Sequence, residues 1–212
     1  MQEIRGFTEY KLGLRDRILD AAIRQFAERG VKLSKMDDIA ASLAISKRTL
    51  YELYDNKEQL IYEAIKRHHR LKDERLSEFA KDPAHDVLDI VIFIYRTHIQ
   101  ESGSLKPTFY DEIAKYPRVV EYLKREREYK SDVFQEFMRR GVDEGFFRSE
   151  INFEIIAHLF DALGAYMHAQ HLYERYSFEE LFFNMLFVSL RGFCTPKGIE
   201  KLDSFFRVHN KC

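Results

Sequence analysis

Ser34-Lys-Met-Asp-Asp-Ile-Ala-Ala-Ser-Leu-Ala-Ile-Ser-Lys-Arg-Thr-Leu-Tyr-Glu-Leu-Tyr-Asp-Asn-Lys57 is the stretch that decides the fold of this chain. Its pattern predicts two short helices joined by a tight turn, followed by the start of a third helix. Ile39 and Leu43 give the first short helix an apolar face, and Leu50 gives one to the second. The spacing therefore predicts a helix-turn-helix.

The second helix of this motif opens with Ser-Lys-Arg-Thr (46–49), which are small or basic residues. A recognition helix presents its N-terminal end to the major groove, where Lys47 and Arg48 can donate to guanine O6 and N7. Hydroxyl and basic residues near helix N-termini favour phosphates. The predicted DNA-binding set is Ser34, Lys35, Ser46, Lys47, Arg48, Thr49, Tyr51, Tyr54 and Lys57. On spacing alone, an ordinary helical hairpin with capped ends remains the alternative.

Composition favours a helix-rich chain with one large domain or two small ones. Of the 212 residues, 45% are apolar and 33% are charged, and the 4 Pro and 9 Gly leave few helix breakers. The formal net charge of −1 argues against a protein that coats DNA regardless of sequence, because that affinity comes from phosphate neutralisation. No apolar run approaches the ~20 residues of a membrane span, and no signal-peptide core is present, so we expect a cytoplasmic protein.

Hydrophobic periodicity predicts an all-α fold with about nine or ten helices and no strand. We expect residues 1–11 to form a loose arm and the first long helix to run from about 12 to 28. Ser34, Ser46 and Asn56 are predicted to cap the next three helices. The last of these three spans about 57–80. Further helices are expected over about 83–103, 106–114, 117–141 (or to 145), 151–173, 177–193 and 195–206.

Residues 12–65 resemble the N-terminal domain of the TetR family of bacterial transcriptional regulators. Several separate pieces match in register: Ile-Leu-Asp-Ala-Ala-Ile-Arg-Gln-Phe-Ala-Glu-Arg-Gly (18–30), Met-Asp-Asp-Ile-Ala (36–40), Ser-Lys-Arg-Thr-Leu-Tyr (46–51) and Asn-Lys-Glu-Gln-Leu (56–60). The resemblance implies a three-helix DNA-binding domain at 11–71 and a larger helical effector-binding and dimerisation domain at 72–212. It also implies a homodimer on a palindromic double-stranded operator, usually acting as a ligand-responsive repressor.

One part of the motif departs from that family. The recognition helix commonly ends in Tyr-x-Tyr-Phe, whereas this chain has Tyr-Glu-Leu-Tyr (51–54). Leu53 replaces an aromatic residue, and Glu52 puts an acid near the groove. Glu52 either accepts from cytosine N4 or faces solvent. This departure supports an alternative function, a ligand-sensing or interaction protein whose DNA-binding domain is vestigial.

Aromatic residues on several predicted helices of the second domain are candidates for an apolar effector cavity. Plain core packing is the alternative for each of them. The partner that this cavity would take is an unknown small, largely apolar effector. The predicted pocket set is Phe93, Phe109, Tyr110, Phe134, Phe137, Met138, Phe160 and Met167.

Two long helices, 153–167 and 178–193, carry more apolar surface than the other helices of one subunit could cover. A four-helix interface between two subunits would bury the excess, and burial within one subunit is the alternative. The predicted dimer-interface set is Phe153, Phe160, Gly164, Phe182, Met185, Leu186 and Ser189.

The sequence predicts no enzyme, no cofactor and no metal site. It has no Gly-x-Ser-x-Gly, phosphate loop or dinucleotide fingerprint. His158, His168 and His171 lack a carboxylate at the spacing of a helical carboxylate–histidine metal motif. Cys194 and Cys212 are predicted to be free thiols in a reducing compartment.

Overall fold

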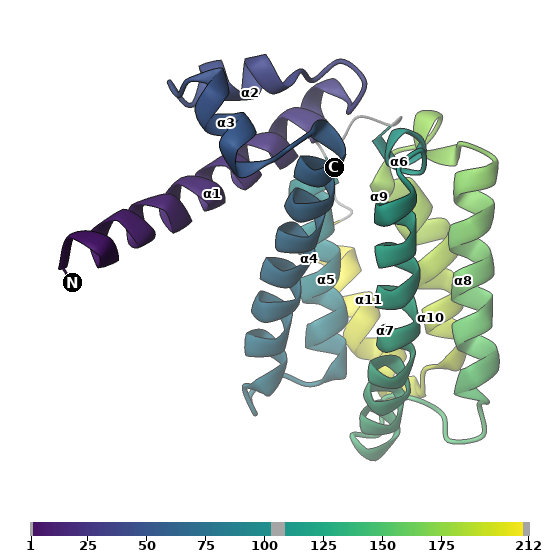
Figure 1. Cartoon of the computed structure of the whole chain (residues 1–212). Coiled ribbons are helices and arrows are strands. Elements are labelled where there is room, and N and C mark those ends of the chain that lie inside the picture. The colour runs from purple at the N-terminus through teal and green to yellow at the C-terminus, as the bar shows by residue number, and fades with distance from the viewer. Residues whose placement is uncertain (1, 103–108, 210–212) are drawn as a thin grey trace. The chain divides into compact units, whose positions relative to one another are not determined.

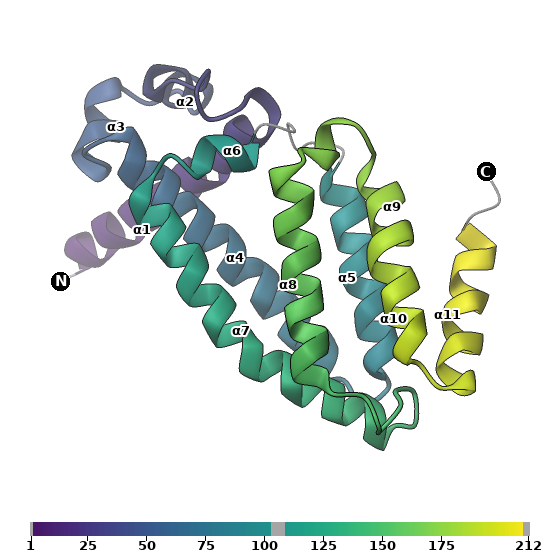
Figure 2. The same ribbon diagram turned by 90° about the vertical axis from the view of Figure 1, so that its right-hand side faces the viewer.

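The computed structural model describes residues 2–102 and 109–209, and in those ranges the secondary structure is helical (Figures 1 and 2). The predicted all-α fold is confirmed for this part of the chain. An isolated antiparallel bridge joins Phe147 to Cys194. The α-helices are α1 (Gln2–Arg29), α2 (Met36–Ser42), α3 (Lys47–Leu53), α4 (Lys57–Lys81), α5 (Val87–Ser102), α6 (Phe109–Ile113), α7 (Pro117–Asp143), α8 (Phe153–Ala169), α9 (Phe178–Leu181), α10 (Val188–Phe193) and α11 (Pro196–His209).

Local capping explains most helix starts. Ser46 caps α3 by accepting from the Thr49 N–H at 3.0 Å, and the Asn56 side chain accepts from the Gln59 N–H at 2.9 Å at the start of α4. Ser177 and Glu180 form a reciprocal capping box before α9. A π-helical segment, Phe182–Phe187, then joins α9 to α10.

Two predicted helix starts are wrong. α1 begins at Gln2, so the expected loose arm is part of the first helix. α5 begins at Val87 instead of about residue 83, because Asp86 supplies the cap: its carboxylate accepts from the N–H groups of Leu88 and Asp89. The sequence signal at Pro83 belongs to the turn before the helix.

The chain divides into two compact units, each with its own core. The first comprises Met1–Asp73 and Ser104–Lys124, and the second comprises Glu74–Gly103 and Arg125–Cys212. α4 and α7 therefore each run from one unit into the other. The break inside α4 lies two residues from the boundary expected at 71/72. Residues 104–124, expected in the second domain, group with the first unit.

The core of the first unit is built from the helix-turn-helix and its supporting helices. Ile18 and Phe26 of α1 pack with Ile39 of α2 and Leu50 of α3, and all four are fully buried. Three buried residues from α6 and the start of α7 complete this core: Phe109, Ile113 and Val119. The recognition helix is thus held by a core that includes a segment far away in sequence.

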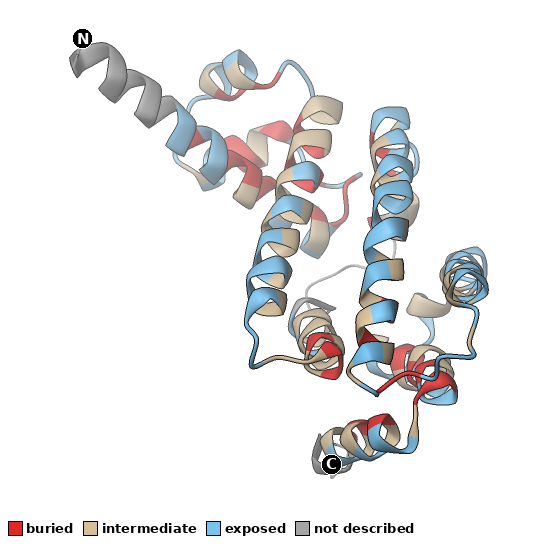
Figure 3. Ribbon diagram, turned by 90° about the horizontal axis from the view of Figure 1, so that it is seen from below, coloured by how far each residue is buried: buried red, intermediate tan, exposed pale blue. Residues whose placement is uncertain are grey.

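The second core is rich in aromatic rings. Met138 and Phe147 are almost fully buried there with Val87, Leu88 and Leu202. The mixture of buried and exposed residues on each helix can be followed in Figure 3. Across the described residues, no helix combines the length and the apolar character that a membrane crossing requires.

Candidate DNA-binding site

The first turn of α3 carries two exposed basic side chains, Lys47 and Arg48. Leu50 anchors the helix in the first core with 0% exposure, and the Ser46 cap fixes its N-terminal end. Lys47 and Arg48 therefore point away from the core, and the Arg48 side chain is 88% exposed. This places two cations where a recognition helix meets base edges.

Both cations of this turn are paired with carboxylates. The Lys47 ammonium donates to Asp37 of α2, and this hydrogen bond raises the Lys47 pKa. The Arg48 Nε donates to Glu52 Oε1 at 2.9 Å, one turn further along α3. The chain thus compensates the recognition-helix charge internally. The sequence placed Glu52 near the groove but did not assign it, or Asp37, as a partner.

Ser34 is not the predicted cap of α2 and does not face solvent. It is 0% exposed, and its hydroxyl donates to the carbonyl oxygens of Gln25 at 3.1 Å and Gly30 at 2.8 Å. Lys35 precedes α2 instead, with an extended backbone and no side-chain cap. The hydroxyl of Ser34 holds the end of α1, so its assignment as a phosphate contact is wrong for this conformation.

Tyr54 is also buried, which corrects its place in the DNA-binding set. Its exposure is 0%, and burial raises the pKa of its phenol. Tyr51 is 47% exposed on the same helix. Of the two tyrosines, Tyr54 is therefore the packed residue and Tyr51 is the accessible one.

The side chain of Lys57 is half-buried in the first unit. Its ammonium donates to the carbonyl oxygen of Val31, and burial lowers its pKa while the carboxylate of Glu112 opposes that shift. Glu112 of α6 also accepts from the Lys32 N–H at 2.8 Å. Lys57 is half-buried, so a phosphate would have to compete with Val31 for its ammonium. No local sequence signal linked Glu112 to this region.

The predicted DNA-binding residues that remain accessible form a smaller set. Five of them are exposed and one is half-buried. The helix-turn-helix brings them together at the start of α2 and along α3. They are Lys35, Ser46, Lys47, Arg48, Tyr51 and the half-buried Thr49, to which Ser46 Oγ is hydrogen-bonded at 2.8 Å.

The predicted effector-pocket residues do not all belong to one unit. Phe109 is buried in the core of the first unit, so its place in a second-unit pocket is wrong. The side chain of Tyr110 lies outside the described residues. Phe93 stacks on Phe79, and Met138 is buried in the second core. The other members are partly buried in the second unit: Phe134, Phe137, Phe160 and Met167.

The predicted dimer residues are mostly on the inward side of their helices. Phe182 is buried against the ring of Tyr95, with centroids 4.6 Å apart, so it is not a surface residue. Phe153 and Phe160 also pack against the second core. Gly164, Met185, Leu186 and Ser189 are half-buried.

The exposed apolar face of α8 is made of residues outside the predicted dimer-interface set. α8 has no buried residue, and five of its apolar or small side chains are exposed at alternating spacings of four and three. This spacing is that of a helix seam which packs against another helix. The α8 stripe consists of Ile155, Leu159, Ala162, Tyr166 and Ala169, and Ile155 is 63% exposed.

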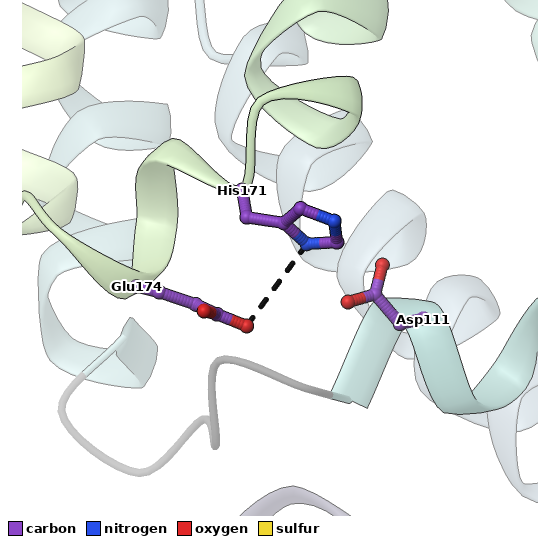
Figure 4. A group of neighbouring side chains, drawn as sticks. All are labelled: Asp111, His171 and Glu174. Atoms are coloured by element: carbon purple, nitrogen blue, oxygen red, sulfur yellow. Dashed lines mark ion pairs between the residues drawn. The ribbon is translucent and has the colours of Figure 1, made fainter.

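Two histidines, one within α8 and one just after it, lie at the surface of the second unit. His158 and His171 are exposed, and the His171 Nδ1 lies 4.0 Å from Glu174 Oε1 (Figure 4). The same nitrogen is 3.3 Å from the Tyr173 hydroxyl. His171 immediately precedes the short 3₁₀ helix Leu172–Glu174, and both of its partners lie in that helix.

Comparison with known sequences matches the helix-turn-helix region. Residues 18–64 fit the model of the bacterial regulatory proteins of the tetR family. The biofilm operon icaADBC negative transcriptional regulator IcaR of Staphylococcus epidermidis is 40% identical over 52 residues, which are 24% of this chain and 28% of IcaR. The match thus spans little more than a quarter of that relative.

A second relative and a solved structure extend the likeness along the chain. The HTH-type transcriptional repressor KstR2 of Rhodococcus jostii is 28% identical over 161 residues, covering 70% of this chain and 74% of KstR2. The crystal structure of reduced E. coli NemR superposes with a TM-score of 0.68 at 14% identity, covering 85% of this chain and 96% of NemR. The latter likeness concerns the fold.

Proposed function

We propose that this chain is a ligand-responsive transcriptional repressor of the TetR family and that it binds a palindromic operator as a homodimer. The observation that carries the proposal is the exposed, capped first turn of α3, which presents Lys47 and Arg48 from a buried scaffold. Catalysis has no part in this proposal, and a cytoplasmic location belongs to it because a bacterial regulator meets its DNA in the cytoplasm.

In the proposed complex, two copies of α3 enter successive major grooves about 34 Å apart on one side of the operator. Arg48 contacts base edges, and Lys35 and Tyr51 contact phosphates, since both are exposed beside the recognition helix. The Lys47 ammonium releases the Asp37 carboxylate and donates to DNA instead. Lys57 joins the phosphate contacts only after releasing the Val31 carbonyl.

The α8 stripe supports the homodimer. Leu159 and Tyr166 are 41% and 57% exposed, and Val188 of α10 is 58% exposed. A contiguous apolar face of this kind is typical of an interface. A second copy of α8 would cover it, because identical stripes are self-complementary about a twofold axis.

The effector proposal rests on the aromatic interior of the second unit. Phe134 and Phe160 are in edge contact, with ring centroids 6.3 Å apart, and both are partly buried. A small apolar molecule is the ligand class that such side chains favour. It must bind two conformers of the dimer with different affinity, because a ligand with equal affinity shifts no equilibrium. α4 is the proposed connection, since it carries Lys57 and continues into the second unit.

Titration of the full-length protein into its upstream intergenic DNA and into random DNA of equal length tests DNA reading. At physiological salt we expect a preference of about a thousandfold or more with two subunits per site. Arg48→Ala should cost about 1–3 kcal/mol on the operator and relax the choice of one base pair. Lys35→Ala should weaken both DNAs alike.

Equal and weak binding to the upstream and random DNA calls for a selection of bound fragments from the whole genome. If that selection also yields no preferred sequence, the vestigial-domain alternative replaces the repressor. A screen of small apolar compounds for release of a bound operator then tests the effector.

The dimer is tested by Leu159→Glu, which places a charge in the α8 stripe. We expect this variant to sediment as a monomer. Tyr129→Glu is the matched control, because Tyr129 is an exposed apolar residue of α7 in the same unit, with 71% exposure. A dimer that survives Leu159→Glu contradicts the assignment of this face.

A further inference from the structure

The ion pair between Arg48 and Glu52 fixes one edge of the guanidinium. Arg48 Nε donates to Glu52 Oε1 at 2.9 Å across one turn of α3. A guanidinium has five N–H donors in a planar fork. With Nε engaged by Glu52, the edge formed by the two terminal nitrogens is left to another planar pair of acceptors.

We infer that Glu52 is a positioning residue that holds Arg48 for a single guanine of the operator. This inference rests on the proposed function. Guanine offers two neighbouring acceptors, N7 and O6, in the major groove, and a terminal guanidinium edge matches them. Glu52 therefore sets base specificity through Arg48 without contacting the base itself.

Exposure explains why Arg48 needs such a partner. Its side chain is 88% exposed, so core packing does not restrict its rotamers. An arginine side chain carries substantial rotamer entropy, and a planar fork placed in advance loses less of it on forming a bidentate contact. The Glu52 carboxylate supplies this order from within the same helix.

The pair between Lys47 and Asp37 has a different character. An ammonium is a point charge without a fork, and Asp37 lies on α2 rather than on the recognition helix. The Lys47 ammonium must break its bond to Asp37 before it can bind DNA. Arg48 can keep Glu52 while it binds, because the Nε contact and the terminal edge are separate. The two adjacent cations thus serve different purposes.

If Glu52 had no positioning role, its removal would be expected to change operator affinity in the opposite direction. Exposed pairs four residues apart in a helix contribute little to stability, so Glu52 can be replaced without unfolding the domain. If Glu52 only repelled phosphates, its removal would strengthen binding to every DNA. If it positions Arg48, its removal weakens binding to the operator. The sign of the change on the operator separates the two roles.

The test uses the full-length protein and an operator obtained by selecting wild-type-bound duplexes from a random library. Binding is measured at one salt concentration for wild type, Glu52→Gln, Arg48→Ala and the double variant. Asp55→Asn is the matched control, since it removes one exposed acid three residues farther along and leaves the Arg48–Glu52 pair in place. Each guanine of the operator is also replaced in turn by 7-deazaguanine, which lacks the N7 acceptor.

We expect Glu52→Gln to weaken operator binding about tenfold, as loss of one well-ordered bidentate contact would. The loss should vanish in the Arg48→Ala background and on the operator that carries 7-deazaguanine at the contacted position. Asp55→Asn should leave operator preference unchanged. Far-ultraviolet circular dichroism and thermal midpoints confirm that all variants fold.

Two results would overturn the inference. One is stronger binding of Glu52→Gln to operator and random DNA alike; the other is a Glu52→Gln loss that persists without Arg48. Failure of the wild type to select any sequence would instead overturn the proposed function, and the inference with it.

Discussion

Glu112 accepts a hydrogen bond from the backbone N–H of Lys32 at 2.8 Å, although eighty residues separate them in the chain. Lys32 lies between α1 and α2, and Glu112 lies on α6. The same carboxylate acts on Lys57, whose pKa burial lowers and Glu112 raises. One side chain of α6 therefore contacts or influences both ends of the helix-turn-helix.

Glu112→Ala should lower the free energy of unfolding by about 1 kcal/mol, the net contribution of one hydrogen bond. The local signature is faster hydrogen exchange of the Lys32 amide, measured by NMR. Glu128→Ala removes an exposed acid from α7 and serves as the control. Equal exchange of the Lys32 amide in both variants would show that Glu112 does not hold this backbone.

Ala44→Gly should stabilise the protein by about 0.5–1 kcal/mol. Ala44 has φ of 54°, a left-handed conformation that costs an L-residue about 1–2 kcal/mol, and the gain is reduced by the greater entropy of glycine in the unfolded chain. Urea denaturation measures the change. Ala41→Gly, within α2, should destabilise by about 1 kcal/mol. Loss of stability at both positions would contradict the strain argument.

Gly141→Ala should destabilise the second unit by about 1–3 kcal/mol through overpacking. A Cβ at this position would lie 2.0 Å from Phe147 Cδ2, and the Phe147 ring is only 2% exposed. Thermal unfolding checks this effect. Gly192→Ala is the control, because a Cβ there meets no heavy atom within 4 Å. A wild-type melting temperature for Gly141→Ala would mean that the Phe147 ring yields easily.

Lys201→Met should lower stability by about 1–2 kcal/mol at pH 7 and by less near pH 3. Lys201 contacts Asp89 at 2.7 Å and also pairs with Asp86, and it links α11 to the start of α5. Burial pushes the Asp89 pKa up, but the hydrogen bond from Lys201 holds it below its ordinary value on balance. A lowered aspartate pKa gives stability that is lost as the pH falls through the folded pKa.

The pKa of Lys201 is raised on balance, because its bonds to the two aspartates outweigh burial. Its stabilising contribution is therefore present below 10.5 and lost as the pH rises through the folded pKa. Urea denaturation of wild type and Lys201→Met at several pH values measures the difference. A difference that does not shrink in acid would assign Lys201 a packing role rather than a charge role.

Cys194 should resist thiol reagents while the protein is folded. It is 4% exposed, and burial raises its pKa to about 12, so the reactive thiolate is scarce at neutral pH. In a Cys212→Ser background, labelling should follow the unfolding transition in urea. Rapid labelling of the native protein at pH 8 would show that the segment around Cys194 opens locally.

Short-range signals in the sequence predicted the features that depend on neighbouring residues. The caps at Ser46 and Asn56 form as predicted, because each cap involves a side chain and an N–H a few residues away. The apolar faces around Ile39 and Leu50 also point into a core. Helical periodicity contains this information directly.

Features that depend on distant segments could not be predicted in the same way. Ser34 resembles a cap, but the carbonyl oxygens at the end of α1 are better placed acceptors. Phe109 follows residues of the second unit in sequence, yet it packs in the first core. The composition of α8 indicated an apolar helix. Which of its faces is exposed depends on which face packs against the rest of the second unit, and the sequence of the helix alone does not contain this.

The division of α4 and α7 between the two units limits the modularity of this protein. A fragment ending at Asp73 would lack Phe109, Ile113 and Val119, and would leave a hole in the core that supports α3. A chimera that keeps the first unit and replaces the second must therefore also carry residues 104–124. Exchange of the whole second unit between related chains would need two matched junctions, one in α4 and one in α7.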